Sequence, residues 1–490
     1  MICAASISSI SIDAIVNATA DNGGGGPYSL RATLGLPQDT PAGTGVGVAV
    51  VDSGIASSPD FGDRISAFYD FTRIALPAAP SDGYGHGTHV AGLIASAGSL
   101  TADVRYQGLG PKVRLIGMKV LDETGAGKTS DVIRAVETAT LLRAVLGIDV
   151  INLSLSHPIY ERASRDPLVR AVEAASRSGI VVVVAAGNYG TNRATGEVGY
   201  GGIASPGNAP SAITVGAAMT QDTTTRRDDR IAPYSSRGPS WYDGFAKPDL
   251  VAPGHLLVSN AGPGSTLYLR YPTLRVSSSY LRLSGTSMAT AVTSGTVALV
   301  IEAHRQTNPN APPLTPNAVK AILEYTSIPM RDAHGVEYDT LTQGAGALNA
   351  AGAIDLTRAI DTTRPTGWYW LTRTLAPATT VAGDAWAWAQ RLVWRTQTIL
   401  GSTIDSNQLA WALTIPWGSS TSTWDSHIVW GSDVVWGDAT STWSSHIVWG
   451  SSDEGDHIVW GSSDDPNNPA WGNLAGNQEA SAPPDDPSRP

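Results

Sequence analysis

Cysteine is nearly absent from this 490-residue sequence, which contains only Cys3. No intrachain disulfide can form, so stability has to come from packing and hydrogen bonding. Long apolar runs are also missing: none approaches eighteen residues, and the sequence predicts no transmembrane segment. Positive charge is not in excess either, because 31 basic residues balance 31 acidic ones before residue 401. A body without a basic surplus argues against nucleic acid as a partner.

The carboxyl-terminal part differs in composition from the rest. Residues 401–490 hold twelve Asp and Glu but only one basic residue, Arg489, and so carry the whole net charge of −11. Fourteen of the fifteen Trp lie at or beyond Trp368. A chain of 490 residues suggests two or three domains, and this shift predicts that a second module begins near residue 361.

From Gly45 onwards, short apolar runs alternate with helical stretches. The expected strands are Val46 to Val51, Val113 to Val120, Asp149 to Leu155, Ile180 to Ala186 and Ala212 to Val215. The expected helices are His86 to Ser96, Ser130 to Leu146, Pro167 to Ser178 and Met288 to His304. This alternation predicts an α/β fold with a mostly parallel central sheet covered by helices on both faces. Functional residues gather at the carboxyl ends of such strands, where Asp52, Ser154 and Asn188 fall.

A candidate nucleophile lies in Leu283-Ser-Gly-Thr-Ser-Met-Ala-Thr-Ala-Val292, which places Ser287 at the first turn of an expected helix. The helix N-terminus favours negative charge that develops beside this serine. A serine hydroxyl is a weak nucleophile at neutral pH. It needs a base, an orienting carboxylate and hydrogen-bond donors for an oxyanion.

Three further motifs supply these parts in a fixed order. They are Val48-Ala-Val-Val-Asp-Ser-Gly-Ile55, Gly85-His-Gly-Thr-His-Val-Ala-Gly92 and Val184-Ala-Ala-Gly-Asn188. With the serine motif, they make the chain resemble the subtilisin-like serine peptidases over roughly residues 28 to 355. The resemblance implies a subtilisin-like three-layer fold and a serine endopeptidase that acts through an acyl-enzyme on Ser287.

The resemblance also gives each residue a role. Asp52 would orient His86, and His86 would take the Ser287 proton and return it to the leaving amine. Asn188 and the Ser287 backbone N–H would form the oxyanion hole, assisted by Thr286. Taken singly, these residues have plainer explanations, namely a turn Asp, a helix-start His, a turn Asn and an N-cap Thr. Their joint occurrence favours the catalytic interpretation.

Substrate contacts follow from the same resemblance. Two strand edges would hold an extended peptide between them, one formed by Gly125, Ala126 and Gly127 and the other by Ser154, Leu155 and Ser156. The first specificity pocket would lie between the second edge and Ala185, Ala186 and Gly187, while glycines 85 and 87 would leave room for the substrate backbone. Small neutral walls, with nothing acidic near the motifs, predict broad specificity for polypeptides and an apolar or uncharged residue before the scissile bond.

Two departures from the family pattern bear on activity. Ser156-His157 replaces the usual Gly-Gly and could narrow the pocket rim or place a titrating group there. Ala291 stands where many members have Pro, which could shift Ser287 slightly. Neither departure removes a catalytic group. The alternative from another functional class is an inactive or weakly active peptide-binding protein with a Trp-rich adhesion module.

No cofactor is required for the implied chemistry, and no metal site is assigned. The loop Ala97 to Pro111 lacks the Asn-rich calcium-binding insertion of some relatives, while structural calcium at other loops is left open.

The first 26 residues have two interpretations. Ala4 to Val16 reads as a strand like the last one of a family propeptide, followed by a flexible hinge at Asp21 to Gly26; an ordinary frayed strand is the alternative. No signal peptide is recognisable at Met1, although the resemblance implies an extracellular or cell-surface protein. The peptidase domain is expected over residues 27–360.

The predicted extension, residues 361–472, is expected to be a small β or irregular region, with residues 473–490 disordered. Thr421 to Ser432 recurs nineteen residues later as Thr440 to Ser451, and His-Ile-Val-Trp-Gly returns at 457–461. The Trp side chains could stack on sugars or a cell-surface polymer, or could pack on each other or on the peptidase domain. His427, His446 and His457 could bind a transition metal, although duplication alone also accounts for their spacing.

Overall fold

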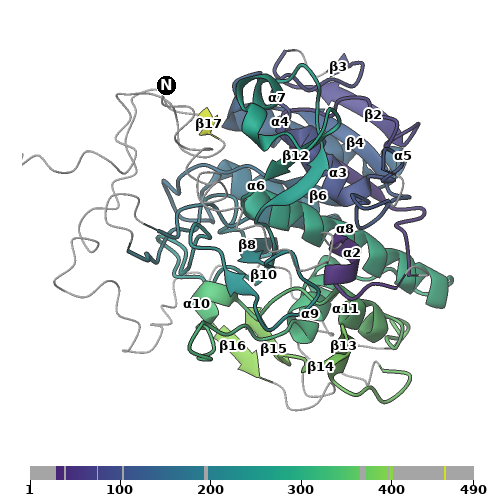
Figure 1. Cartoon of the computed structure of the whole chain (residues 1–490), viewed down its shortest axis with the longest axis vertical. Helices are drawn as coiled ribbons and strands as arrows, with labels where there is room; N and C mark the ends of the chain where they lie inside the picture. Colours follow the sequence, from purple (N-terminus) through teal and green to yellow (C-terminus); the bar gives the residue numbers. More distant parts are fainter. Residues whose placement is uncertain are drawn as a thin grey trace, which may run out of the picture.

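The computed structural model describes residues 29–37, 40–73, 76–101, 104–191, 197–364, 371–394, 397–400 and 457–459. Within them, nine strands form one sheet in the order β10-β8-β7-β6-β1-β4-β2-β3, with β9 paired to β8 (Figure 1). Neighbouring strands are parallel except β2 with β3 and β8 with β9. The predicted α/β class with a mostly parallel central sheet is confirmed. The strands are β1 (Gly47–Asp52), β2 (Ile65–Asp70), β3 (Leu76–Pro77), β4 (Arg114–Lys119), β6 (Ile148–Leu153), β7 (Val181–Ala185), β8 (Ile213–Met219), β9 (Arg230–Ile231) and β10 (Leu250–Pro253).

The central strands are buried on both faces. In β1, Val48 and Val50 belong to one hydrophobic core, while Ala49 and Val51 belong to another. Strand β7 alternates in the same way. Because successive side chains of a strand point to opposite faces, two cores require apolar residues at every position. This explains the near-continuous apolar runs in the sequence.

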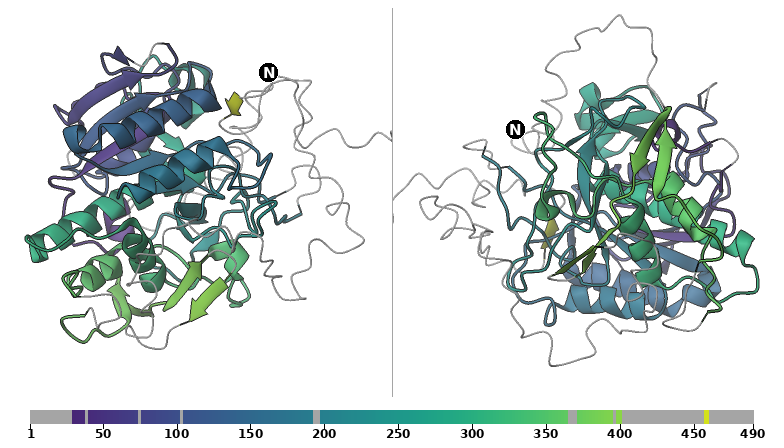
Figure 2. Two further views of the ribbon diagram at one scale, coloured as in Figure 1. Left: turned by 180° about the vertical axis from the view of Figure 1, so that it is seen from behind. Right: turned by 90° about the horizontal axis from the view of Figure 1, so that it is seen from below.

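Helices cover both faces of the sheet and complete the three layers. Figure 2 shows α4 (Thr129–Leu141) and α6 (Pro167–Arg177) side by side on one face. On the other face, α3 (His86–Ala95) packs against α8 (Thr286–Thr307), and α8 contacts α11 (Ala350–Thr357), which in turn packs on α9 (Pro316–Thr326). The remaining short helices are α2 (Leu30–Thr33), α5 (Arg143–Leu146), α7 (Thr266–Arg270), a 3₁₀ turn (Pro272–Leu274) and α10 (Thr340–Gln343).

The helix expected over residues 130–146 is interrupted. It breaks at Leu142 into α4 and α5, and α5 ends at Gly147 in a left-handed conformation. No residue of α5 is buried, so tertiary packing does not hold it in line with α4.

Among the described residues, α8 is the one helix long and apolar enough to cross a bilayer, and 94% of its apolar window is buried inside the protein. Some of its threonine hydroxyls are satisfied within the helix: Thr290 and Thr293 donate to the carbonyls of Thr286 and Ala289, each four residues earlier. The helix is accounted for as the central core helix of the fold.

Two hairpins follow the predicted domain boundary: β13 (Ala378–Val381) with β14 (Asp384–Ala387), and β15 (Arg391–Trp394) with β16 (Gln397–Leu400). Trp388 is 4% exposed, donates from Nε1 to Thr379 Oγ1 at 2.7 Å and meets the Tyr325 ring edge-on. The Val393 N–H donates to the buried Glu324 carboxylate at 2.8 Å. Residues 388 and 392 thus share a hydrophobic core with residues before 361, and the domain boundary near residue 361 stays a prediction. The Trp388 side chain packs against the body of the protein, as one of the two hypotheses for the Trp side chains predicts.

Several predictions fall outside the described residues. These are the propeptide-like strand and hinge before residue 27, the repeats at 421–432 and 440–451, and the disordered segment 473–490. The sugar-binding and metal-binding hypotheses for the repeats therefore stay predictions.

A buried carboxylate fixes the end of α3. Asp60 accepts hydrogen bonds from Ser96 at the end of that helix (2.9 Å), Ser99 (2.8 Å), Asn260 (2.8 Å) and Tyr280 (2.8 Å). Asn260 and Tyr280 belong to the antiparallel pair β11 (Leu257–Asn260) and β12 (Tyr280–Leu283), which is thereby tied to α3. Burial acts to raise the pKa of Asp60, but these hydrogen bonds outweigh it and the net pKa is lowered.

We expect Trp388→Ala to lower the free energy of unfolding by roughly 3–5 kcal/mol, because it opens a cavity in the core. Urea unfolding in a Ser287→Ala background, which removes the expected nucleophile, measures the effect. The matched control is Trp386→Ala in the same hairpin, where the ring is only half-buried. Equal losses in the two variants would contradict the assignment of Trp388 to the core.

We expect Asp60→Asn to lower the free energy of unfolding by about 2–3 kcal/mol at neutral pH. A carboxyl whose pKa is lowered by folding stabilises the fold above the usual Asp range, and that stabilisation is lost as pH falls through the lowered value. The Asn variant should therefore show a shallower decline of stability below about pH 4 than the parent. The exposed Asp63→Asn is the control; parallel pH profiles for parent and Asp60→Asn would refute this account.

Candidate active site

Asp52 and His86 meet where β1 ends and α3 begins. Asp52 Oδ1 lies 2.7 Å from His86 Nδ1, and both side chains are 0% exposed. The same oxygen accepts the Ser53 backbone N–H at 2.7 Å. Because a carboxylate only accepts, Nδ1 carries the hydrogen and Nε2 is left as the basic nitrogen. This is the arrangement that a histidine needs to act as a general base.

The close approach of α3 to β1 depends on glycine. A Cβ on Gly87 would overlap the Gly54 carbonyl and lie 3.0 Å from Asp52 Cβ. The space beside Gly87 is thus filled by the end of β1, and the expectation that this glycine leaves room for substrate is wrong. Gly85 caps the helix with φ = 102°, and a Cβ there would overlap the Ser265 hydroxyl.

Asp82 is a positioning residue that the sequence analysis missed. Its carboxylate accepts hydrogen bonds from Ser53 Oγ (2.8 Å), the Gly85 N–H (2.7 Å) and both N–H and hydroxyl of Thr88 (2.8 and 2.6 Å). Ser53 Oγ in turn accepts the Gly87 N–H at 2.9 Å. An acidic residue before the first turn satisfies otherwise unpaired helix donors and complements the helix dipole. The sequence feature that could have predicted this role is an Asp placed shortly before the glycine-rich start of a helix.

Ser287 is the second residue of α8 and is 2% exposed. Its Oγ donates to the Ser154 carbonyl at 3.0 Å, while Ser154 Oγ donates to the Ser287 carbonyl at 3.0 Å. Ser154 Oγ also accepts from Asn152 Nδ2 at 2.9 Å. These bonds fix the start of α8 against the end of β6.

His89 connects the helix of His86 to the segment that leads to Ser287. Its Nε2 donates to the carbonyls of Leu257 (3.1 Å) and Leu281 (3.2 Å), in β11 and β12. Strand β12 ends at Leu283, four residues before Ser287. Burial, and then the proximity of His86, lower the pKa of His89 to about 3, so its ring stays neutral. The role of His89 is therefore structural.

Asn188 follows β7 and contacts the residue before the serine. Its Oδ1 accepts the Thr286 N–H at 2.9 Å and the Thr286 hydroxyl at 3.1 Å. The hydroxyl oxygen accepts the Gly187 N–H at 3.3 Å. With Oδ1 engaged by Thr286, the Nδ2 hydrogens of Asn188 are the donors left to face an oxyanion. The Thr286 hydroxyl donates to Asn188 Oδ1 and so helps to orient this amide; the assistance of Thr286 to an oxyanion stays a prediction.

Two of the three predicted substrate segments directly follow neighbouring strands of the central sheet. Leu153 and Val184 are register partners at the ends of β6 and β7, so residues 154–156 and 185–187 run on side by side from those ends. The third segment, residues 125–127, lies on β5 (Ala126–Lys128) and the turn before it. The members of these three segments are Gly125, Ala126, Gly127, Ser154, Leu155, Ser156, Ala185, Ala186 and Gly187.

The two departures from the family pattern are accommodated without loss of a catalytic group. His157 is buried, its Nδ1 lies 2.6 Å from the Pro158 carbonyl, and its ring stacks on Tyr160 at 5.7 Å. Ala291 is fully buried within α8, which continues unbroken past it.

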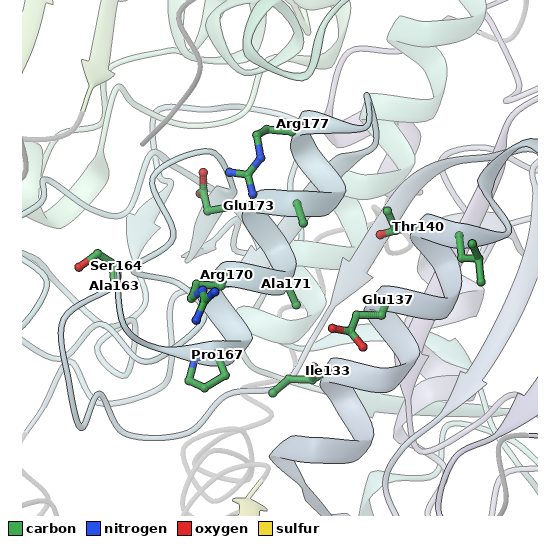
Figure 3. Close-up of a pocket in the computed structure, with 12 residues that line it drawn as sticks. Ile133, Glu137, Thr140, Ala163, Ser164, Pro167, Arg170, Ala171, Glu173 and Arg177 are labelled. Atoms are coloured by element: carbon green, nitrogen blue, oxygen red, sulfur yellow. The ribbon is translucent and has the colours of Figure 1, made fainter. Parts of the chain in front are cut away.

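A separate hollow of about 740 Å³ lies between α4 and α6 (Figure 3). Its polar lining includes Glu137, Arg170 and Arg177, and none of the predicted site residues lines it. No group of three or more His, Cys, Asp or Glu side chains in the described part of the chain could hold a metal ion. Structural calcium stays a prediction.

Comparison with known proteins agrees with this geometry. The profile of the Subtilase family matches residues 43–353. Serine protease AprX of Bacillus subtilis (strain 168) is 41% identical over 316 residues, which cover 64% of this chain and 66% of AprX. Subtilisin E of the same organism is 36% identical over 266 residues, which cover 54% of this chain and 57% of subtilisin E. The chain therefore spans less than two thirds of either relative.

Among solved structures, Sphericase matches with a TM-score of 0.51 and 27% sequence identity, covering 66% of this chain and 97% of the other. The subtilisin-like fold is thus shared over the described body of the protein. Since the family profile covers well over half of the 490 residues, the chain belongs to the subtilase family.

Proposed function

We propose that this protein is a serine endopeptidase that hydrolyses peptide bonds through an acyl-enzyme on Ser287. The observation that carries the proposal is the buried 2.7 Å hydrogen bond between Asp52 and His86, on a helix that packs against the helix of Ser287. Membership of the subtilase family supports it, as does the likeness to a protein named serine protease.

In the proposed reaction, the Ser287 hydroxyl turns from the Ser154 carbonyl toward His86 Nε2, which takes its proton as Oγ attacks the substrate carbonyl carbon. Asp52 stabilises the resulting imidazolium. The oxyanion receives hydrogen bonds from Asn188 Nδ2 and the Ser287 N–H. His86 then protonates the leaving amine. In the second half of the reaction, water takes the place of the amine: His86 removes a proton from the water as it attacks the acyl-enzyme, and then returns a proton to Ser287 Oγ.

The substrate class is a polypeptide in extended conformation. Segments 125–127 and 154–156 offer backbone groups on two sides, and the segments 154–156 and 185–187 contain only Ser, Leu, Ala and Gly. No charge in these segments would select a charged residue, so we propose broad specificity with an apolar or uncharged residue before the scissile bond. Action outside the cell or at its surface is part of the proposal and rests on the family alone.

The first test is covalent labelling with a serine-directed fluorophosphonate. We expect one label per chain on Ser287, and Ser287→Ala should abolish labelling and lower kcat by roughly 10⁶-fold. Ser294→Ala is the control, because Ser294 lies on the same helix but hydrogen-bonds to Asn152. A correctly folded parent protein without label would instead support the inactive peptide-binding protein.

The second test separates the parts of Asn188 and Thr286. Asn188→Ala should lower kcat by roughly 10²–10³-fold with little change in KM, because the donor acts only on the oxyanion. Thr286→Val keeps the donor but loosens its orientation, so we expect a smaller loss, of about tenfold. The exposed Asn310→Ala should leave both constants unchanged. An effect of Asn188→Ala confined to KM would assign Asn188 to ground-state binding.

A further inference from the structure

A strand from the carboxyl-terminal tail lies on the proposed substrate edge. Strand β17 (His457–Val459) pairs antiparallel with β5, with His457 opposite Lys128, Ile458 opposite Gly127 and Val459 opposite Ala126. The two strands form a sheet of their own, separate from the central sheet. Figure 1 shows β17 next to the part of the body that contains α4, whose first residue follows β5 directly. More than 300 residues of sequence separate the two paired segments.

Strand β5 has only one edge available to a partner strand. On its inner side the Asp122 N–H donates to the Ala126 carbonyl at 2.8 Å. Because the N–H and C=O of successive residues point to alternating sides, Gly127 directs its backbone groups to the side of β17, opposite Ile458. A substrate strand would use the same groups. β17 and a substrate therefore exclude each other at β5.

The direction of β17 is that of a substrate approaching the serine. A Cβ on Gly125 would lie 2.6 Å from the Tyr84 ring, so this end of β5 is the one beside the start of α3 and His86. Because β17 is antiparallel to β5, its carboxyl end faces that same end. A substrate paired with β5 in the same antiparallel direction would run its residues before the scissile bond toward the catalytic groups.

The sequence supplies this strand in more than one copy. His-Ile-Val-Trp-Gly occurs at 427–431, 446–450 and 457–461, all in one tail. A binding segment tethered to its own site has an effective concentration of about 1 mM. Charge also favours docking, since Asp453, Glu454 and Asp456 precede β17 in the sequence and its first residue pairs with the exposed Lys128.

We infer that the His-Ile-Val-Trp-Gly segments bind one at a time to the β5 edge as substrate-like strands and compete with polypeptide substrates within the same chain. This inference rests on the proposed function, because only a peptidase would use the β5 edge to bind substrate. An intramolecular competitor of this kind raises the apparent KM and leaves kcat unchanged.

The activity test uses the full chain and a short fluorogenic peptide. The triple variant Ile428→Pro, Ile447→Pro and Ile458→Pro removes the N–H that faces Gly127 from every copy. If the three copies together have an effective concentration of about 1 mM and each has a Kd near 0.1 mM, KM should fall by about tenfold at unchanged kcat. The control carries three prolines outside the copies, Ser422→Pro, Ser441→Pro and Ser463→Pro. Equal KM values in parent and triple variant would overturn the inference.

A binding test does not depend on catalysis. In a Ser287→Ala background, fluorescence anisotropy of a labelled Ser-His-Ile-Val-Trp-Gly-Ser peptide should show about tenfold tighter binding to the triple proline variant than to the chain with its own tail. A scrambled peptide should not bind, and absence of binding by the true peptide overturns the inference. Intact mass showing that the parent cuts within 457–461 also overturns it, because the tail would then be a substrate rather than a resident strand.

The two tests keep the proposals apart. If the protein is labelled on Ser287 but shows no change in KM and no peptide binding, only the tail inference is wrong. If the protein binds the peptide but is neither labelled nor able to hydrolyse substrate, the proposed function is wrong, and the pairing of the tail with β5 is peptide binding alone.

Discussion

The hydrogen bond between Asp52 and His86 is the contact on which the site depends. It joins the end of the central strand β1 to the start of α3, and neither side chain reaches water. A buried carboxylate is stable only where donors surround it, and here Ser53 N–H and His86 Nδ1 supply them. The bond requires two backbones to approach more closely than side chains permit, which restricts position 87 to glycine.

A second carboxylate holds that geometry in place. Asp82 binds the end of β1 through Ser53 and the first turn of α3 through Gly85 and Thr88. Any tilt of α3 away from β1 would break several charge-assisted hydrogen bonds at once. At the far end of the same helix, Ser96 is bound to Asp60. The helix that carries His86 is therefore fixed at both ends, and the histidine is preorganised before substrate arrives.

Sheet topology brings the other groups to the same place. Strands β1, β6 and β7 are neighbours, and Asp52, Ser154 and Asn188 lie at or just beyond their carboxyl ends. Helix α8 then brings Ser287 to this edge, where Ser154 and Asn188 each bond to its first turn. Strand order, which no single motif encodes, thus decides that residues far apart in sequence contact one another.

The sequence was most informative where burial is complete. Apolar runs located β1, β4, β6, β7 and β8, because strands buried on both faces must be apolar throughout. Strand β2 was missed, since Ile65-Ser-Ala-Phe-Tyr-Asp70 is partly exposed and has mixed polarity. Packing was one of two hypotheses for the Trp side chains, and composition alone could not decide between them, because it does not show whether a tryptophan such as Trp388 faces the core. Asp82 and Asp60 read as ordinary turn residues until the donors around them, which come from distant segments, are known.

The edge of β5 shows why recognition and self-contact are linked. A peptidase of broad specificity has to bind its substrates through their backbones, so it must leave strand hydrogen-bonding groups open. Open strand edges pair with any extended chain, and natural proteins usually cover them or interrupt them with charge. Covering β5 permanently would abolish substrate binding, whereas a tethered strand covers it reversibly. In the proposed competition, three copies on one acidic tail would keep the edge occupied without tight binding by any one of them, and a substrate would gain access in proportion to its concentration.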